Sequence, residues 1–314
     1  MIRQWGDASG ATRNIAEQED GTPLAYTIEA ADGPIRLQYF APPEHLRRYF
    51  GSLYLFSETL DTYSDVTRAD VPQLRLMLQG GGHYKFHDGT VLATPEVCLL
   101  GPTLGATRFH LEGAARVVGM SLLPAGWISL HGGDASEEAD RLQSLGGDGN
   151  RAFDDLLRQL RTMDDPQEMV ALCWSVLAGL VKPLSDATWR LLEAVDNWLM
   201  DEGSPRIETL AQRTGLSPRQ LARLTNRYYG CPPKLLARKY RALRCSARIA
   251  LDRHSWQELC EDSRFYDQSH FIREIKHFIG LTPHQLQNEP SAVAQLTLLR
   301  RSLGGDVAVL NRMS

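Results

Sequence analysis

The chain has 314 residues, of which 43% are hydrophobic and 23% are charged, a globular composition that excludes wholesale disorder and suits two domains. Its longest near-continuous apolar run, Met169 to Val181, is shorter than the roughly twenty residues of a membrane span, and the N-terminus lacks the apolar core of a secretory signal. The five cysteines form no CxxC pair, which is typical of a reducing compartment and argues against structural zinc. We therefore expect a cytoplasmic protein with no membrane partner.

The net charge of −4 conceals an uneven distribution along the chain. Between Gly203 and Pro290, fifteen Lys and Arg stand against eight Asp and Glu, and the stretch from Arg206 to Arg248 carries eleven basic residues and one acid. A basic C-terminal module on an otherwise acidic chain indicates a polyanionic partner for that module. On charge alone, a solvated helical face fits equally well.

The first third of the chain has the pattern of an antiparallel β structure. Residues 1–34 are polar and broken by Gly and Asp, so we expect a loose lead-in there. Residues 35–125 contain short alternating runs separated by turn formers, which predicts a small β barrel or sandwich. Among the separators we expect Gly80-Gly81-Gly82 and Glu112-Gly113 to be turns between strands.

Two amphipathic helices are predicted between residues 150 and 183. Apolar residues recur at helical spacing in Phe153–Leu160 and again in Met169–Leu180. In the second helix, apolar surface is left on more than one side by Leu172, Val176, Leu177 and Leu180. This favours a dimer contact over a helical hairpin that only packs on the barrel.

A helix-turn-helix pattern begins at Ser204-Pro205, which is an N-cap followed by proline at the first helical position. The first helix is expected to end at Gly215, and Ser217 is expected to cap a second helix that ends at Gly230. A short helix, a tight turn and a capped second helix together indicate a helix-turn-helix unit. The second helix is expected to turn three apolar side chains inward and three polar ones outward: Leu221, Leu224 and Tyr228, against Arg219, Arg223 and Asn226.

The same design recurs about fifty residues later in the chain. Phe271, Ile275 and Phe278 are expected to be buried, while Ser269, Arg273 and Lys276 point outward. Between the two units, residues 233–252 predict one basic linking helix. Two such units joined by a helix can place two recognition helices in successive major grooves, about 34 Å apart on B-DNA.

These residues resemble the AraC/XylS family of bacterial transcription regulators. The resemblance rests on Leu210-Ala211-x3-Gly215-Leu216-Ser217-Pro218, on Phe265-Tyr266-Asp267-Gln268-Ser269-His270-Phe271-Ile272-Arg273, and on Gly280-Leu281-Thr282-Pro283. It implies sequence-specific binding of double-stranded promoter DNA by both units, with RNA polymerase as a further partner. Arg264 stands where the family usually has the turn glycine. Tyr266 replaces the usual small capping residue, so Asp267 is the expected cap.

The resemblance also implies roles for individual side chains. Five of them would face bases or the flanking phosphates: Arg219, Arg223, Gln268, Ser269 and Arg273. Arginine can pair with the N7 and O6 atoms of guanine, and glutamine with the N6 and N7 atoms of adenine. Five others are assigned to the DNA backbone, which positions the protein without specifying sequence: Asn226, Arg227, Lys234, Lys276 and Thr282.

The N-terminal part resembles the cupin-like sensor domains that many members of this family carry, through its strand rhythm and the stretches at residues 101–103 and 123–126. Such a domain binds an effector, dimerises, or both. Its metal-ligand candidates are His83, His87, His110 and Glu96, but metal cupins usually place two histidines one residue apart, and His83 and His87 are four apart. We expect strand and turn histidines, with no metal and no other cofactor. Tyr84 and Phe86 are expected to line an apolar pocket.

The expected fold is α+β with two domains: a cupin-like β barrel with a helical hairpin, and an all-α domain with two helix-turn-helix units joined by a linking helix. We divide the chain into a lead-in (1–34), an effector-sensing or dimerisation domain (35–184, with the barrel at 35–125 and the helices at 150–183), a DNA-binding domain (185–290) and a C-terminal extension (291–314).

The expected function is transcription regulation without catalytic residues, in response to a small molecule and with a homodimer as a further expectation. A cupin-type enzyme fused to a DNA-binding module and an effector-free architectural binder stay open as alternatives. The sequence identifies neither the effector nor the target genes, and it leaves activation and repression undecided.

Overall fold

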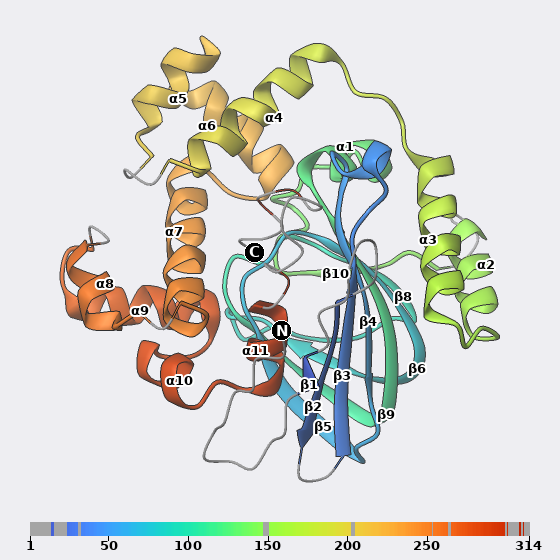
Figure 1. The fold of residues 1–314 in the computed structure, drawn as a ribbon. Helices are drawn as coiled ribbons and strands as arrows, with labels where there is room; N and C mark the ends of the chain where they lie inside the picture. Colours follow the sequence, from blue (N-terminus) through green and yellow to red (C-terminus); the bar gives the residue numbers. More distant parts are fainter. Residues whose placement is uncertain are drawn as a thin grey trace.

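The computed structural model describes residues 14–15, 24–30, 33–146, 151–201, 205–252, 254–262, 265–298, 300, 308 and 310. Strands dominate the described chain up to residue 144, and helices dominate it from residue 151 onward. In Figure 1 the strands curl around one centre; the helices between residues 207 and 288 lie on one side of them, and the two helices between residues 151 and 180 lie on the other. The predicted α+β, two-part organisation is confirmed.

The described strands form a single antiparallel sheet in the order β1-β2-β3-β4-β9-β6-β8-β10, with β5 paired to β9 and β7 paired to β6. Their bounds are β1 Asn14–Ile15, β2 Leu24–Ala30, β3 Gly33–Phe40, β4 Phe50–Glu58, β5 Thr62–Thr67, β6 Gln73–Lys85, β7 Val91–Ala93, β8 Val97–Leu100, β9 Thr107–Leu122 and β10 Leu142–Ser144. A short 3-10 helix, η1, spans Glu44–Leu46 between β3 and β4.

Part of the segment that we expected to be a loose lead-in is structured. Strand β1 pairs with β2, and β2 pairs along its whole length with β3. The remainder of residues 1–34 lies outside the described chain.

The prediction that two glycine-containing segments are turns between strands is wrong. Gly80-Gly81-Gly82 lies inside β6 and Glu112-Gly113 lies inside β9. Gly80 and Gly113 have φ angles of 79° and 70°, and the register between β6 and β9 shifts between Met77 and Gly81. The glycines therefore mark irregularities within long, bent strands rather than strand ends. The bend lets β9 pair with β5 over its first half and with β4 over its second half.

The predicted helical hairpin is present and packs on one face of the sheet. After α1 (Pro124–Leu130), it consists of α2 (Arg151–Leu160) and α3 (Pro166–Leu180). Leu156 and Leu177 are fully buried in one cluster with Leu76 of the sheet. Most of the apolar surface of the hairpin thus covers the barrel, and the dimer contact stays a prediction.

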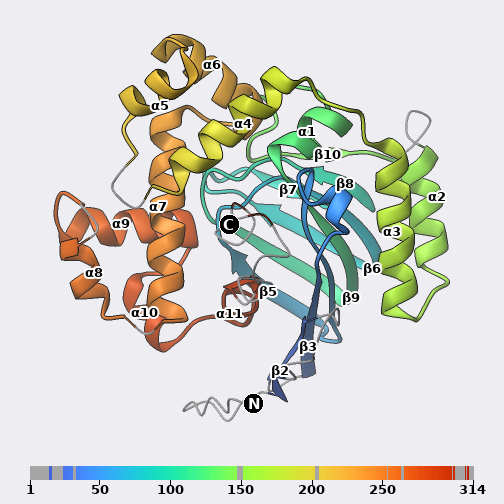
Figure 2. The same ribbon diagram turned by 45° about the horizontal axis from the view of Figure 1, so that its top comes forward.

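Seven further helices form the C-terminal half, and an eighth follows them. They are α4 Asp186–Leu199, α5 Ile207–Thr214, α6 Pro218–Tyr229, α7 Pro233–Ala250, α8 Trp256–Asp262, α9 Gln268–Ile279, α10 Pro283–Asn288 and α11 Ala292–Leu298. The pairs α5/α6 and α8/α9 are the two helix-turn-helix units, and α7 stands between them (Figure 2). Leu221 of α6, Tyr240 of α7 and Phe271 of α9 share one buried cluster, so both units rest on a single core. None of the described helices is both long enough and apolar enough to cross a membrane.

The sequence signals for the helix ends are confirmed except at the start of α5, which begins at Ile207 with Arg206 as its N-cap, so the prediction that Pro205 is the first helical residue is wrong. Ser217 and Gln220 form a reciprocal capping box at the start of α6. The helices α5 and α6 end at Gly215 and Gly230, whose φ angles of 68° and 82° require the left-handed region. Asp267 caps α9 by accepting a hydrogen bond from the His270 backbone N–H at 2.7 Å. Ser204, the predicted cap, lies outside the described residues, and so does Arg264, which stands where the family usually has the turn glycine.

Candidate nucleic-acid interface

The five side chains assigned to bases lie on exposed surface of the two recognition helices. Arg219 and Arg223 are one helical turn apart on α6, and Ser269 and Arg273 are one turn apart on α9, with Gln268 at its start. All five are exposed. They point outward because each helix commits its opposite face to the shared core, through residues such as Leu221 and Phe271.

The inward face of α6 differs from the one that the sequence predicted. Leu221 is fully buried as expected, but its buried companions are Thr225 and Tyr229, while Leu224 and Tyr228 are only half-buried. A spacing of four residues keeps Leu221, Thr225 and Tyr229 on one slowly drifting stripe. Tyr229 belongs to it because its hydroxyl donates to Asp196 Oδ1 of α4 at 2.8 Å, a partner that sequence periodicity cannot supply.

The residues assigned to the DNA backbone divide into two groups. Arg227, Lys234 and Lys276 are exposed, as that role requires. Thr282 caps α10, with its hydroxyl accepting from the Gln285 backbone N–H at 3.2 Å. Asn226 is half-buried, and its Oδ1 atom is buried with no hydrogen-bond partner among the described residues. Geometry therefore favours the three cations for phosphate contacts over the other two side chains.

Most basic side chains of the linking helix α7 are used inside the protein. Lys239 is 2% exposed, and its Nζ atom donates to the carbonyl oxygens of Asp70 at 2.6 Å and Thr103 at 2.9 Å, both in the barrel. Burial lowers the pKa of Lys239 below its ordinary value. Arg244 donates to the backbone carbonyl of Leu199, and the Arg241 guanidinium lies 4.5 Å from the centre of the Phe265 ring.

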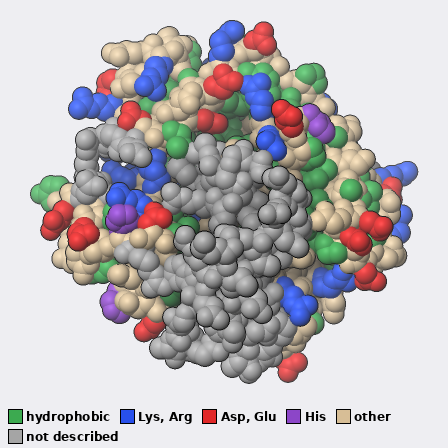
Figure 3. Space-filling view, viewed as in Figure 1, with side chains coloured by type: hydrophobic (Ala, Val, Ile, Leu, Met, Phe, Trp, Pro, Cys, Tyr) green, Lys and Arg blue, Asp and Glu red, His purple; other side chains and the backbone are tan. Residues whose placement is uncertain are grey.

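Arg238 pairs with a carboxylate of the second recognition helix. Its Nε and Nη2 atoms donate to Glu274 at 3.0 and 2.5 Å. Burial by itself would raise the pKa of Glu274, but the hydrogen bonds and charge of Arg238 outweigh burial and hold that pKa below its usual range. The basic stretch from Arg206 to Arg248 thus offers DNA fewer cations than its composition indicates. Figure 3 shows Lys and Arg side chains over α5 and α6 with Asp and Glu among them.

The C-terminal ends of both recognition helices dock on the barrel. The carbonyl oxygen of Arg227 on α6 accepts from the Ala135 N–H at 2.9 Å. On α9, the carbonyl oxygens of Phe278 and His277 accept from the N–H groups of Ala69 and Ala106, both at 2.7 Å. Because docking uses these ends, the N-terminal halves of α6 and α9, which carry the assigned base readers, remain exposed.

One exposed residue at this surface was recognised in the sequence only as a replaced cap. Tyr266 is 92% exposed and lies two residues before Gln268, at the entrance to α9. Its side chain is thus free to contact a partner that approaches the N-terminal half of α9. Its position next to the family motif was the signal that could have identified it.

The barrel encloses a cavity with mixed lining. Its apolar walls include Leu37, Phe56, Met77 and Val117, and the space open to the centres of water molecules is about 80 Å³, several times what one water molecule needs. Tyr84 lines this cavity as expected, whereas Phe86 does not and is buried elsewhere in the barrel core.

The histidines that would suit a metal cupin do not gather at the cavity. The rings of His83 and His110 lie 5.1 Å apart, and His110 Nδ1 is 2.7 Å from the Ser64 hydroxyl. His87 instead contacts Asp140 at 3.5 Å and packs against His277 of α9. Among the described residues, no group of three or more His, Cys, Asp or Glu is placed to hold a metal ion.

Comparison with known proteins agrees with the geometry of the helical half. A family model described as a helix-turn-helix domain matches residues 210–289. Among solved structures, ToxT from Vibrio cholerae is 10% identical and covers 76% of this chain and 98% of its own, at a TM-score of 0.44. The AraC-like transcriptional activator CuxR is 16% identical over 77% of this chain and 88% of its own, at 0.30.

A cupin 2 conserved barrel domain protein from Rhodopseudomonas palustris is 12% identical over 55% of this chain and 97% of its own, at a TM-score of 0.23. No curated protein sequence matches the chain. The motif residues, the two capped recognition helices and the family match concern the same segment of the chain. Residues 210–289 therefore form a helix-turn-helix domain, within which α5/α6 and α8/α9 are the two units.

Proposed function

We propose that this chain is a transcription regulator of the AraC type, which reads a specific promoter sequence with both recognition helices and carries out no catalysis of its own. The observation that supports this most is the pair of exposed stripes, Arg219 with Arg223 on α6 and Ser269 with Arg273 on α9, held on one core. Arginine forks suit guanine, and Gln268 suits adenine. Two stripes of different chemistry favour sequence reading over an architectural role.

Exposed cationic side chains make the contacts of this interface to the DNA backbone. Arg227 and Lys234 lie near the first unit, and Lys276 lies on the second. Such contacts fix the register of the protein on the duplex and make binding salt-dependent. Tyr266 adds an aromatic surface at the start of α9, suited to packing against a thymine methyl group or a sugar beside the bases that Gln268 reads.

The barrel cavity is the proposed effector site. Apolar walls with a few polar side chains are usual for sites that bind small organic molecules. The polar lining includes the guanidinium groups of Arg68, Arg75 and Arg300, which favour a ligand that carries an anionic or hydrogen-bond-accepting group on an apolar body. RNA polymerase and a second copy of the chain remain proposed partners.

Selection of bound fragments from genomic DNA, followed by footprinting, tests this proposal. We expect one enriched sequence class with two protected stretches about one helical turn apart, and Arg223→Ala should remove protection from one of them. Arg158→Gln is the matched control, because Arg158 is an exposed arginine on α2 that pairs with Asp155 at 2.6 Å, away from both units. Fragments no more enriched than random DNA would contradict sequence-specific reading.

A further inference from the structure

The chain returns to the barrel after the DNA-binding domain. Helix α11 lies against β5, and Figures 1 and 2 place it beside the strands. Asp65 of β5 accepts from the Val293 N–H at 2.8 Å, and Leu296 is 1% exposed in a cluster with Leu37. The carbonyl oxygen of Thr297 accepts from Arg68 Nη2 at 3.0 Å. These contacts fix the C-terminal segment to the barrel.

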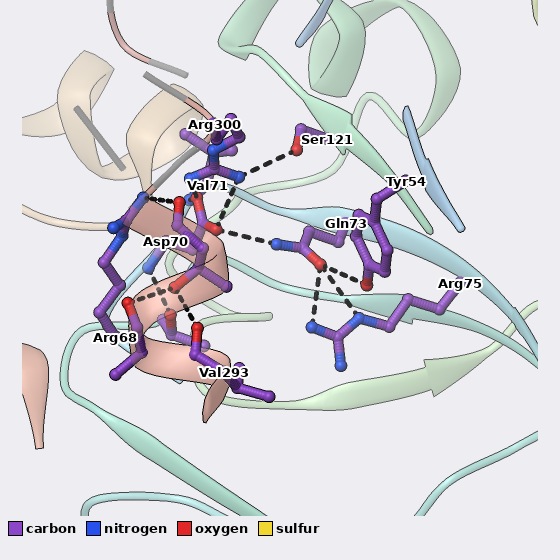
Figure 4. A network of polar contacts seen from close by, with 12 residues as sticks. Tyr54, Arg68, Asp70, Val71, Gln73, Arg75, Ser121, Val293 and Arg300 are labelled. Carbon is purple, nitrogen blue, oxygen red and sulfur yellow. Dashed lines mark hydrogen bonds and ion pairs between the residues drawn. The ribbon is translucent and has the colours of Figure 1, made fainter. Parts of the chain in front are cut away.

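This segment supplies part of the cavity wall. Val293, Thr297 and Arg300 all line the cavity that we propose as the effector site. Arg300 is 2% exposed and pairs with Asp70 through two contacts, Nη1 to Oδ2 at 3.1 Å and Nη2 to Oδ1 at 3.2 Å (Figure 4). Arg300 Nη1 also donates to the Ser121 hydroxyl at 3.5 Å, so among the described residues one carboxylate and one hydroxyl hold the guanidinium at the cavity.

Charge at the cavity is unbalanced. Three guanidinium groups line it, those of Arg68, Arg75 and Arg300, and Asp70 is the one carboxylate among its described lining residues. The Asp70 carboxylate has other donors besides Arg300: Gln73 Nε2 at 2.9 Å and the Val71 N–H at 2.7 Å. It would therefore keep hydrogen bonds if Arg300 turned to another anion.

Asp70 also touches the DNA-binding domain. Its carbonyl oxygen accepts from Lys239 of α7, and the neighbouring Ala69 N–H donates to the Phe278 carbonyl oxygen of α9. The residues around Asp70 thus join the cavity, the C-terminal segment and the linking and second recognition helices. A change in the partner of Arg300 acts directly on this junction.

We propose that Val293, Thr297 and Arg300 form part of the effector site and that Arg300 selects an organic anion there, whose anionic group replaces the Asp70 carboxylate as the partner of Arg300. The inference rests on the proposed effector function of the barrel. When an anionic ligand binds, the buried guanidinium of Arg300 still has a negatively charged partner. An uncharged ligand must leave the pair of Arg300 and Asp70 intact, because separating the two would leave the buried guanidinium without a counter-charge.

The test compares two compounds with the same carbon frame, 4-phenylbutyrate and 4-phenylbutan-1-ol, by isothermal titration calorimetry on the full chain. We expect the wild-type protein to prefer the carboxylate. Arg300→Gln should weaken carboxylate binding by about tenfold or more and leave alcohol binding little changed, because it removes a charge-assisted contact. Asp70→Asn should tighten carboxylate binding, because the competing carboxylate is gone.

Because Arg300→Gln should weaken carboxylate binding and Asp70→Asn should tighten it, the two variants distinguish recognition of the carboxylate by Arg300 from a purely structural role of the pair. If the two substitutions only loosened the C-terminal segment, both variants would bind both compounds more weakly than the wild type. That result would overturn the inference. Val117→Phe narrows the cavity and should reduce binding of both compounds, while Arg158→Gln should match the wild type. Wild-type protein that binds neither compound, or binds both equally, also overturns it.

Promoter binding is measured on the same preparations. Protein that selects a DNA sequence but shows no preference for the carboxylate refutes the Arg300 assignment and leaves the DNA-reading function in place. Protein that selects no DNA sequence refutes the proposed function whatever the titrations show.

Discussion

The salt dependence of DNA binding measures how many cations of this domain face the phosphates. Six assigned cations are exposed: Arg219, Arg223, Arg227, Lys234, Arg273 and Lys276. The slope of log K against log salt is about −0.9 for each phosphate neutralised. The three cations assigned to the backbone, Arg227, Lys234 and Lys276, therefore predict a slope of about −3, which becomes about −5 when the three base-facing arginines also neutralise the phosphates that flank their bases. If all eleven basic residues between Arg206 and Arg248 contacted phosphates, the slope would be about −10.

The assay is fluorescence anisotropy of the selected promoter fragment between about 50 and 200 mM salt. Lys234→Gln and Lys276→Gln should each make the slope shallower by about 0.9. Arg241→Gln is the informative control: Arg241 is half-buried beside the Phe265 ring, so the variant can change affinity but should leave the slope unchanged. A wild-type slope near −10, or a slope change in Arg241→Gln equal to that in Lys234→Gln, would refute the internal use of the α7 cations.

Three further predictions concern single side chains. Arg223→Ala and Arg273→Ala should each cost about 1–3 kcal/mol on the cognate site and relax base preference there, whereas equal losses on random DNA would contradict base reading. Tyr266→Ala should weaken cognate binding several-fold but change the free energy of unfolding by less than about 0.5 kcal/mol, because the side chain is exposed. Burial raises the pKa of Asp196 to about 7 against an ordinary 3.8, so the folded state keeps a proton that the unfolded state loses, and stability should fall as pH rises from about 4 to 7. The three-unit shift corresponds to about 4 kcal/mol, which partial exposure reduces to roughly 2, and Asp196→Asn should abolish this fall in urea titrations at pH 5 and pH 8.

Local sequence signals were sufficient for most helix ends in the helical half of the protein, but not for the buried face of α6 or the start of α5. Ser217, Gly215, Gly230 and Asp267 end or begin helices where the sequence indicates, because a cap depends on hydrogen bonds within one turn of chain. The outward direction of the base readers followed from helical periodicity for the same reason. The resemblance to a known motif then supplied their roles, which periodicity does not contain.

Non-local packing decided what the sequence left undetermined. Gly80 and Gly82, which resemble part of a turn, lie inside the bent strand β6 because β9 approaches their backbone too closely for a side chain, and the sequence does not show that approach. The partners of Tyr229 and Lys239 lie 33 residues or more away in the chain, and no local rule distinguishes a buried lysine from a solvated one.

The sequence by itself therefore determined that the chain carries two capped helix-turn-helix units, since those depend on contacts within a few residues. Only the tertiary structure decided that most basic side chains of α7 contact other parts of the protein. The same holds for the ion pair between Arg300 and Asp70, which are 230 residues apart in the chain. The physical reason is that the free energy of a charge depends on its surroundings, and distant segments of the chain supply those surroundings.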